Sequence, residues 1–244
     1  MIQVSDCHVS ADPDADYRGQ SASRNLARLL PAVRARASDL LLLTGDVSED
    51  GSEASYQRVA AALEATGLAV HALPGNHDDP ETMRRHFPLG PWTGPHVVDV
   101  GRWRIILLDS TRAGDVSGFF SRRELEDFER AARAGQAEHL LVGLHHQPLL
   151  SGSPWIDRYA LRHRDEFLDR LDAERRLRCV VWGHIHQDFR TRRGGVAMLG
   201  APSSAVNSLP RRERFTTDPR GPACRWLELV PDGEVRKGIL FAEK

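Results

Sequence analysis

Five short stretches of the chain carry side chains that bind metal ions or transfer protons. They are Asp6-Cys7-His8, Gly45-Asp46, Gly75-Asn76-His77-Asp78, His145-His146 and Gly183-His184-Ile185-His186. Each stretch follows an apolar run that is typical of a β-strand. Imidazole, carboxylate and amide groups are ligands of transition metal ions. We therefore expect the five stretches to meet in space and to hold two metal ions.

The spacing in two of these stretches brings a pair of ligands to one side of the backbone. Asp6 and His8 are two positions apart, and so are His184 and His186. In an extended segment, side chains two positions apart point to the same side, so each pair can face one or two metal ions. Cys7 points away from its neighbours, which favours a small buried apolar residue over a ligand.

His145 and His146 are direct neighbours, so their side chains are expected to point in opposite directions. Only one of the two is then expected to bind a metal ion. We favour His145, because it directly follows a predicted strand, and His146 stays the alternative.

The remaining two stretches offer a bridging ligand and an acid. Gly45-Asp46 follows a predicted strand, and one carboxylate there can bridge two metal ions through its two oxygens, although an ordinary turn is the alternative. Gly75 lets the backbone turn sharply before Asn76, which offers a neutral oxygen ligand. His77 beside Asp78 is typical of an imidazole oriented by a carboxylate, as a general acid requires.

The composition is that of an ordinary globular protein. Of the 244 residues, 41% are hydrophobic and 27% charged, and the net charge is −1. Such a chain forms one large domain or two small ones. The near-neutral charge provides no field that would attract nucleic acid or a membrane surface, so we expect neither as a partner. A glycine-rich phosphate loop with a lysine is also missing, which argues against ATP-driven chemistry.

Cysteine usage and hydropathy bear on the compartment. The three cysteines are few, odd in number and widely spaced, which favours a reducing compartment. No apolar run approaches the ~20 residues of a membrane span, and no signal peptide is visible. We therefore expect a cytoplasmic protein. The short lead-in Ile2-Gln3-Val4 leaves open whether the first strand is clipped or the start is misassigned.

Hydrophobic periodicity predicts an alternation of strands and helices, followed by hairpins. Strands are predicted over residues 2–5, 39–44, 68–73, 96–100, 103–109, 139–144 and 178–182, with a tight turn at Gly101-Arg102. Helices are predicted over residues 21–37, 52–65, 80–86, 121–134 and 164–173, with Pro31 kinking or restarting the first. Loops are predicted over residues 151–163 and 203–222, and hairpin turns at Gly194-Gly195 and Asp232-Gly233. This order predicts two sheets with helices outside, and functional groups at the carboxyl ends of strands.

The ordered set of Asp-x-His, Gly-Asp, Gly-Asn-His-Asp, His-His and Gly-His-x-His resembles the calcineurin-like metallophosphoesterases over residues 2 to about 200. The resemblance implies an α/β fold, a four-layer α/β/β/α sandwich with two mixed sheets flanked by helices. We expect a single domain over residues 1–244, with residues 201–244 as a C-terminal loop and hairpin extension. One implied metal site consists of Asp6, His8, Asp46 and His186, and the other of Asp46, Asn76, His145 and His184.

A narrower resemblance, to the bacterial class III cyclic-AMP phosphodiesterases, extends over nearly the full length. It is carried by His145-His146-Gln147-Pro148, Ser153-Pro154-Trp155-Ile156-Asp157, Gly183-His184-Ile185-His186-Gln187, Ala201-Pro202-Ser203-Ser204 and Arg225-Trp226-Leu227-Glu228-Leu229. Cys7 departs from the pattern, where a threonine or similar small residue is usual. The resemblance implies hydrolysis of 3′,5′-cyclic AMP to 5′-AMP by in-line attack of a metal-bridging hydroxide. His77, held by Asp78, would protonate the leaving oxygen.

Two other functions stay open. One is a broad phosphodiesterase acting on glycerophosphodiesters or 2′,3′-cyclic nucleotides, and the other is a non-catalytic scaffold with the same fold. The predicted partner is a small phosphodiester such as a cyclic nucleotide, and a homodimer built through the hairpin-rich tail is a further alternative.

The predicted substrate contacts are Asn76, His77, His146 and Trp155, and Trp155 is either a platform for a base or a packing anchor. The mixed ligand set predicts two divalent or mixed-valence transition metal ions. Mn, Fe, Zn or Co suit it better than Mg or Ca, and we favour Fe and Mn.

Overall fold

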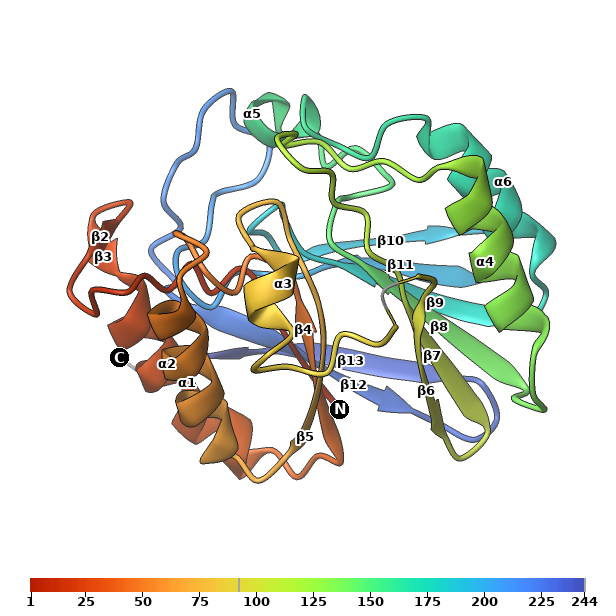
Figure 1. Ribbon diagram of the computed structural model, residues 1–244, viewed down its shortest axis with the longest axis horizontal. Helices are drawn as coiled ribbons and strands as arrows, with labels where there is room; N and C mark the ends of the chain where they lie inside the picture. Colours follow the sequence, from red (N-terminus) through yellow and green to blue (C-terminus); the bar gives the residue numbers. More distant parts are fainter. Residues whose placement is uncertain (92, 244) are drawn as a thin grey trace.

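Two β-sheets lie at the centre of the molecule, and helices cover their outer faces (Figure 1). The computed structural model describes residues 1–91 and 93–243. The strand order is β13-β12-β1-β4-β5 in one sheet and β10-β11-β9-β8-β7-β6 in the other. Helices α1 and α2 flank the first sheet, and α4 and α6 flank the second. The four-layer α/β/β/α arrangement of two mixed sheets is thereby confirmed.

The element bounds are close to those expected from the periodicity. The first sheet contains β1 (Ile2–Val4), β4 (Leu40–Thr44), β5 (Ala69–Leu73), β12 (Ala223–Leu229) and β13 (Val235–Phe241). The second contains β6 (His96–Val100), β7 (Trp103–Leu107), β8 (His139–Leu144), β9 (Leu177–Trp182), β10 (Phe189–Arg193) and β11 (Val196–Gly200). The helices are α1 (Ala22–Ala35), α2 (Glu53–Glu64), α3 (Pro80–Met83), α4 (Arg122–Arg133), α5 (Pro154–Asp157) and α6 (Arg164–Ala173).

Strand β4 shows why the buried strands are nearly continuous apolar runs in the sequence. Leu41 and Leu43 pack in a cluster with residues of α1 and α2, whereas Leu40 and Leu42 pack in a cluster with side chains of the second sheet. Successive strand residues face opposite sides. Because both sides of the strand are covered, the four positions before Thr44 are all leucine, as is usual for buried parallel strands.

Three local expectations differ from the structure. Helix α1 runs unbroken through Pro31, which lies on its exposed face, so the proline does not restart the helix. The stretch 151–163 is not all loop, because Pro154–Asp157 forms the short helix α5. A small hairpin of β2 (Asp16–Tyr17) and β3 (Gln20–Ser21) was not expected, because two-residue strands carry no periodic signal.

The C-terminal hairpin is part of the first sheet. Strand β12 pairs antiparallel with β1, which pairs in parallel with β4 on its other side. Strand β1 is fully buried and lies in the interior of the sheet. The segment that leads directly to Asp6 and His8 is therefore fixed by strands on both sides.

The parallel strands place the five stretches at the same end of the two sheets. Strands β1, β4 and β5 run in parallel in the first sheet, as do β7, β8 and β9 in the second. The sheets meet at this end, because the Gln3 amide donates to the Thr44 hydroxyl at 3.1 Å and to the carbonyl of Trp182 at 3.2 Å. The carboxyl ends of strands from both sheets thus lie side by side.

Arg225 of β12 provides a second link between the sheets. Its guanidinium is fully buried and donates to Asp188 at 2.8 Å and to the carbonyl of Gly200 at 2.7 Å. Arg190 pairs with the same carboxylate at 2.7 Å, but its side chain is 43% exposed. One carboxylate therefore has a buried and an exposed cationic partner.

We expect Arg225→Ala to lower the free energy of unfolding by about 3 kcal/mol, because it removes a buried ion pair and leaves buried acceptors without a donor. Arg190→Ala is the matched control and should cost at most about 1 kcal/mol, because that pair is solvent-exposed. Equilibrium unfolding in urea measures both values. Equal losses in the two variants would contradict this role of Arg225.

Candidate metal centre

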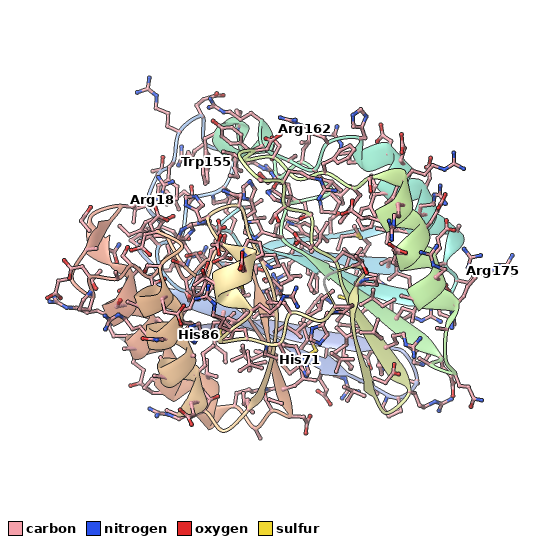
Figure 2. The ribbon with its side chains drawn as sticks, viewed as in Figure 1. Arg18, His71, His86, Trp155, Arg162 and Arg175 are labelled. Carbon is pink, nitrogen blue, oxygen red and sulfur yellow. The ribbon has the colours of Figure 1, made fainter. Side chains whose placement is uncertain are left out.

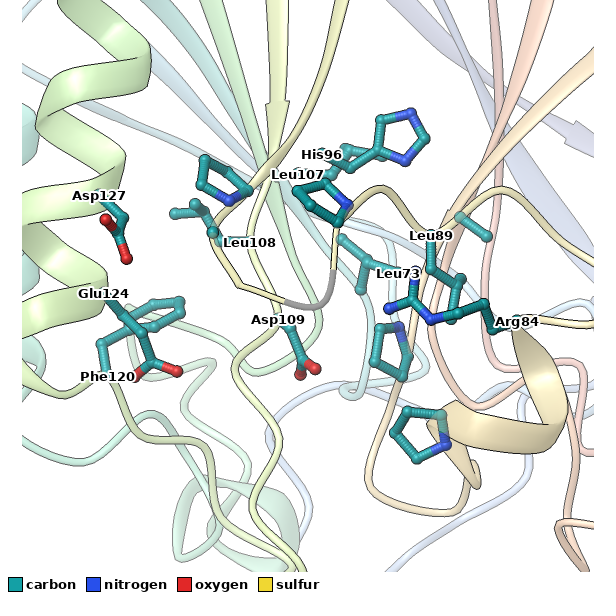
Figure 3. Close-up of a pocket in the computed structure, with 16 residues that line it drawn as sticks. Leu73, Arg84, Leu89, His96, Leu107, Leu108, Asp109, Phe120, Glu124 and Asp127 are labelled. Carbon is teal, nitrogen blue, oxygen red and sulfur yellow. The ribbon is translucent and has the colours of Figure 1, made fainter.

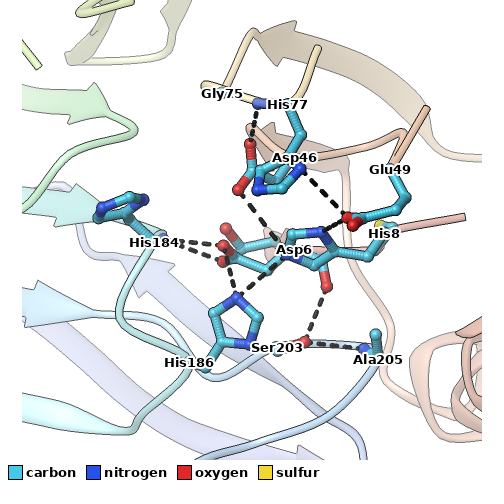
Figure 4. Close-up of polar contacts among 12 residues, drawn as sticks. Asp6, His8, Asp46, Glu49, Gly75, His77, His184, His186, Ser203 and Ala205 are labelled. Carbon is cyan, nitrogen blue, oxygen red and sulfur yellow. Dashed lines mark hydrogen bonds and ion pairs between the residues drawn. The ribbon is translucent and has the colours of Figure 1, made fainter. Parts of the chain in front are cut away.

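The first group of predicted ligands converges between the two sheets (Figure 4). His186 Nε2 lies 3.3 Å from Asp6 Oδ1 and 3.1 Å from His8 Nε2. His8 Nε2 lies 3.7 Å from Asp46 Oδ2. All four side chains are almost completely buried. The atoms of Asp6, His8 and His186 are close enough together to hold one metal ion.

The second group shares Asp46 with the first. His145 Nε2 lies 3.3 Å from Asp46 Oδ2 and 3.1 Å from His184 Nδ1. Asp46 Oδ1 instead accepts the backbone N–H of His77 at 2.9 Å. A single oxygen of Asp46, rather than both, therefore faces the two groups. Asn76 Oδ1 is buried without a hydrogen-bond partner among the described residues.

The protonation of the imidazoles tests whether these residues fit a metal ion. Three of them direct Nδ1 at oxygen acceptors: His8 at the carboxylate of Glu49 (2.6 Å), His145 at the carbonyl of Thr44 (2.8 Å) and His186 at the carbonyl of Val206 (2.8 Å). Each Nδ1 therefore carries the proton, and in the neutral ring Nε2 presents a lone pair to the centre.

Lone pairs that face each other need a cation between them. The Nε2 atoms of His8 and His186 are 3.1 Å apart. Nitrogens bound to one metal ion at about 2.0–2.1 Å are separated by about this distance. Asn76, whose neighbour His77 donates its backbone N–H to Asp46, has a buried Oδ1 without a hydrogen-bond partner among the described residues. The residues present therefore fit metal ions.

The electrostatics of the centre also favour positive charge. Burial opposes ionisation of Asp46, but the histidines around it, led by His145, hold its pKa well below the ordinary value. Burial lowers the pKa of His145, and Asp46 more than offsets this, raising it to about 9. Burial and the neighbouring histidines hold the pKa of His184 well below its ordinary value, so this ring stays neutral.

Left-handed backbone conformations, rather than extended ones, aim these side chains. Positive φ angles occur at Asp6 (53°), His8 (45°), Asp46 (50°), His184 (67°) and His186 (53°). The expectation that an extended backbone brings each pair of ligands, Asp6 with His8 and His184 with His186, to one side was therefore wrong. The side chains do converge. Such conformations are costly for residues with side chains, and they collect at functional sites.

Gly75 and Gly183 are required for space. A Cβ atom on Gly75 would overlap Asp46 Oδ1, and one on Gly183 would overlap the Ser5 hydroxyl. Gly75 does not have a left-handed φ, so the turn at this position does not itself require a glycine. Its role is to let the β5 loop approach the Asp46 carboxylate closely.

Asp78 does not orient His77, which corrects the expectation from their adjacency. The Asp78 carboxylate accepts the N–H groups of Val47, Ser48 and Gly75 and the hydroxyl of Tyr56. Its burial and the nearby charge of Asp46 raise the pKa of Asp78 to about 6. Asp78 therefore fixes the loops after β4 and β5 to each other.

Glu49 takes the place expected of Asp78. Its Oε2 lies 3.2 Å from His77 Nδ1 and 2.6 Å from His8 Nδ1, so one carboxylate holds both rings (Figure 4). The side chain of His77 is 38% exposed, which leaves it accessible from solvent. Sequence reasoning missed Glu49, although an acid three positions after Asp46 near a strand end was a usable signal.

His145 and His146 do not point in opposite directions. Their ring centroids are 4.9 Å apart, because both residues lie beyond the end of β8, where the strand pleat no longer applies. His146 is fully buried, with Nδ1 at 2.8 Å from the Ser110 hydroxyl and Nε2 at 3.1 Å from the carbonyl of Val116. His145, His146 and His184 lie close enough together to hold one metal ion, but of the two neighbours it is His145 that faces Asp46, so we keep His145 as the proposed ligand. The buried contacts of His146 do not support its expected substrate contact.

Trp155, the other predicted substrate contact, lies beside the centre at 6.4 Å from the His186 ring. A separate cavity of about 160 Å³ is lined by residues that include Leu73, Arg84, Asp109 and Glu124 (Figure 3). None of the predicted ligands lines that cavity. We therefore assign the site to the histidine–carboxylate centre, where donor atoms converge.

Comparison with known proteins agrees with this geometry. The family model of calcineurin-like phosphoesterases matches residues 1–188. A curated relative from Pseudomonas aeruginosa, named 3′,5′-cyclic adenosine monophosphate phosphodiesterase, is 37% identical over 98% of this chain and 88% of its own. A protein of the same name from Escherichia coli K12 is 32% identical over 96% of this chain and 86% of its own. The chain belongs to the calcineurin-like phosphoesterase family.

Solved structures show the same fold. A dimetal phosphatase from Danio rerio has a TM-score of 0.66 at 12% identity and covers 99% of this chain and 98% of its own. A purple acid phosphatase from yellow lupin has a TM-score of 0.65 at 11% identity, covering 98% of this chain and 53% of its own. Among the residues that the structure describes, no helix has the length and hydropathy needed to cross a membrane.

Replacing Glu49 with glutamine should lower metal affinity or turnover roughly 10- to 100-fold, the usual effect of losing an outer partner of a ligand histidine. The carboxamide keeps the volume but loses the charge that holds His8 and His77. Metal content after dialysis and phosphodiester turnover measure the effect. Glu64→Gln, on the exposed end of α2, is the control, and equal behaviour of the two variants would rule out this role of Glu49.

Proposed function

We propose that this protein is a metal-dependent phosphodiesterase that hydrolyses 3′,5′-cyclic AMP to 5′-AMP. The observation that carries the proposal is Asp46 Oδ2, which faces His145 at 3.3 Å and His8 at 3.7 Å and thus joins two ligand groups. The substrate is supported by relatives named cyclic AMP phosphodiesterases that align with 96–98% of this chain.

The two proposed metal sites share one carboxylate. The first consists of Asp6, His8, Asp46 and His186, and the second of Asp46, Asn76, His145 and His184. Mixed nitrogen and oxygen donors suit Mn, Fe, Zn or Co, and we favour Fe and Mn. When bound, two such ions lower the pKa of water and withdraw charge from phosphoryl oxygens.

His77 is the proposed general acid. Its Nδ1 faces Glu49 at 3.2 Å, and its backbone N–H donates to Asp46, so both the ring and the loop are held in place. The tautomer fixed by Glu49 makes Nε2 the atom at which His77 would hold and release a proton. For cyclic AMP the leaving oxygen is the ribose 3′ oxygen, an alkoxide that requires protonation.

A non-catalytic scaffold with the same fold is the alternative that must be distinguished from an enzyme. In this chain every proposed ligand position is filled, and the donor atoms of the described residues converge. A scaffold needs neither the lone pairs that face each other nor the strained φ angles. These costly features support the enzyme.

We expect the protein, stripped by a chelator and reloaded with Mn²⁺, to hydrolyse 3′,5′-cyclic AMP faster than 2′,3′-cyclic AMP or glycerophosphodiesters at matched metal. Asp46→Ala should abolish turnover of all of them, because it removes a ligand from both metal sites. Product formation and bound metal are measured together. Glu81→Ala, an exposed acid on α3, is the control.

Two results would count against this proposal. Wild-type turnover in Asp46→Ala would exclude the shared carboxylate. Equal rates on all substrates of the panel would replace the cyclic-AMP enzyme with a broad phosphodiesterase.

The acid role predicts a dependence on the leaving group. His77→Ala should slow hydrolysis of cyclic AMP about 100-fold or more, since general acids contribute this much when the leaving oxygen is a poor one. The loss should be much smaller for bis(p-nitrophenyl) phosphate, whose leaving phenolate needs no proton. Steady-state kcat is compared for the two substrates, with His71→Ala as the control, and equal losses would exclude the acid role.

A further inference from the structure

Three planar side chains gather beside the metal centre from segments far apart in the sequence. Arg18 comes from the β2–β3 turn, Trp155 from α5 and Phe215 from the loop over residues 203–222. The Arg18 Cζ atom lies 3.9 Å from the Phe215 ring centroid and 5.8 Å from that of Trp155. The two aromatic rings are 5.1 Å apart at 75°. We call these three residues the aromatic shelf.

The shelf packs against His186, one of the proposed ligands. The ring of His186 lies 6.4 Å from Trp155 and 6.0 Å from Phe215, measured between centroids. His186 Nε2 faces Asp6, so only the His186 ring separates the shelf from the proposed metal position. Figure 2 shows Arg18 and Trp155 on neighbouring segments at the same end of the molecule. A substrate whose phosphate lies between the metal ligands can therefore reach the shelf with the group next to it.

The backbone of Arg18 adds an independent observation. Arg18 (φ 54°) and Gly19 (φ 84°) form the two-residue turn between Tyr17 and Gln20, which pair across the hairpin. Turns with two positive φ angles strongly favour asparagine followed by glycine. A long cationic side chain in that position is strained, and strain of this kind collects where function requires it. Here it places an exposed guanidinium over the face of Phe215.

We propose that the aromatic shelf binds the nucleobase of the substrate by stacking. The inference rests on the proposed function, because it assigns the base of the cyclic nucleotide to a place beside the same centre. Trp155 and Phe215 are half-buried and accept a planar ring, as aromatic side chains do with bases in single-stranded nucleic acids. The base takes the place of the guanidinium on Phe215, and Arg18 moves onto its outer face.

Because the shelf binds the base by stacking, it does not discriminate one base from another. Every base has a π-face, and an arginine plane stacks on each of them. Arg18 offers donors only, so it cannot pair with both the acceptor and the donor on the major-groove edge of adenine. The shelf therefore selects nucleotides over base-free phosphodiesters, and it binds adenine and guanine equally well.

Competitive inhibition of bis(p-nitrophenyl) phosphate hydrolysis by the Mn²⁺-loaded protein measures the contribution of the base. In the wild type, 5′-AMP should inhibit at roughly tenfold lower concentration than ribose 5-phosphate, the size of one stacking contact. This ratio should fall toward one in Phe215→Leu and Trp155→Leu, which keep an apolar side chain. Arg18→Asn suits the turn and should lower the ratio without unfolding the hairpin.

The controls separate this inference from the proposed function. Arg214→Ala removes an exposed charge from the same loop and should leave the ratio unchanged. An unchanged ratio in all three shelf variants, or a wild-type ratio of one with cyclic AMP still hydrolysed, would overturn the shelf. A normal ratio in a wild type that does not hydrolyse cyclic AMP would support the shelf and overturn the proposed substrate. A large preference for 5′-AMP over 5′-GMP would overturn binding by stacking.

Discussion

The Asp46 carboxylate is the interaction on which the rest of the centre depends. One oxygen faces histidines from both sheets, and the other holds the loop that carries His77. Because the carboxylate is buried, its charge has to be matched by cations. His145 supplies part of that match, because Asp46 raises its pKa to about 9, whereas burial holds the pKa values of His8 and His184 below the ordinary value. The two sheets thus meet around one buried carboxylate whose partners come from both.

The backbone around this charge stores strain. Five proposed ligands adopt left-handed conformations, and two glycines leave just enough space for neighbouring loops to touch. Residues with side chains hold such conformations only where the surroundings over-determine them. Here the surroundings are strands on both sides of β1 and the Asp78 carboxylate, which gathers N–H donors from two loops. The paired strands thus hold the strained residues at their ends in fixed positions.

Much of the fold was predictable, because buried parallel strands read as apolar runs and their carboxyl ends carry the polar groups. The residues that we propose as ligands lie at or near those ends. The predicted directions of individual side chains were wrong. Adjacency suggested that Asp78 would hold His77 and that His145 and His146 would diverge, but both pairs lie beyond strand ends, where the pleat no longer governs side chains. The position of Glu49 near a strand end marked it as a candidate, but its partners could not be assigned, because they come from other loops.

The position of β1 has a consequence for folding. Ile2 pairs with Trp226 and Gln3 with Arg225, so β1 and β12 come from distant parts of the chain. Pairs this far apart form slowly, because a long loop must close before the contact is made. Until β12 pairs, one side of β1 is an open sheet edge, and such edges pair readily with other chains. Protection of β1 against aggregation therefore depends on one of the most non-local contacts of the fold.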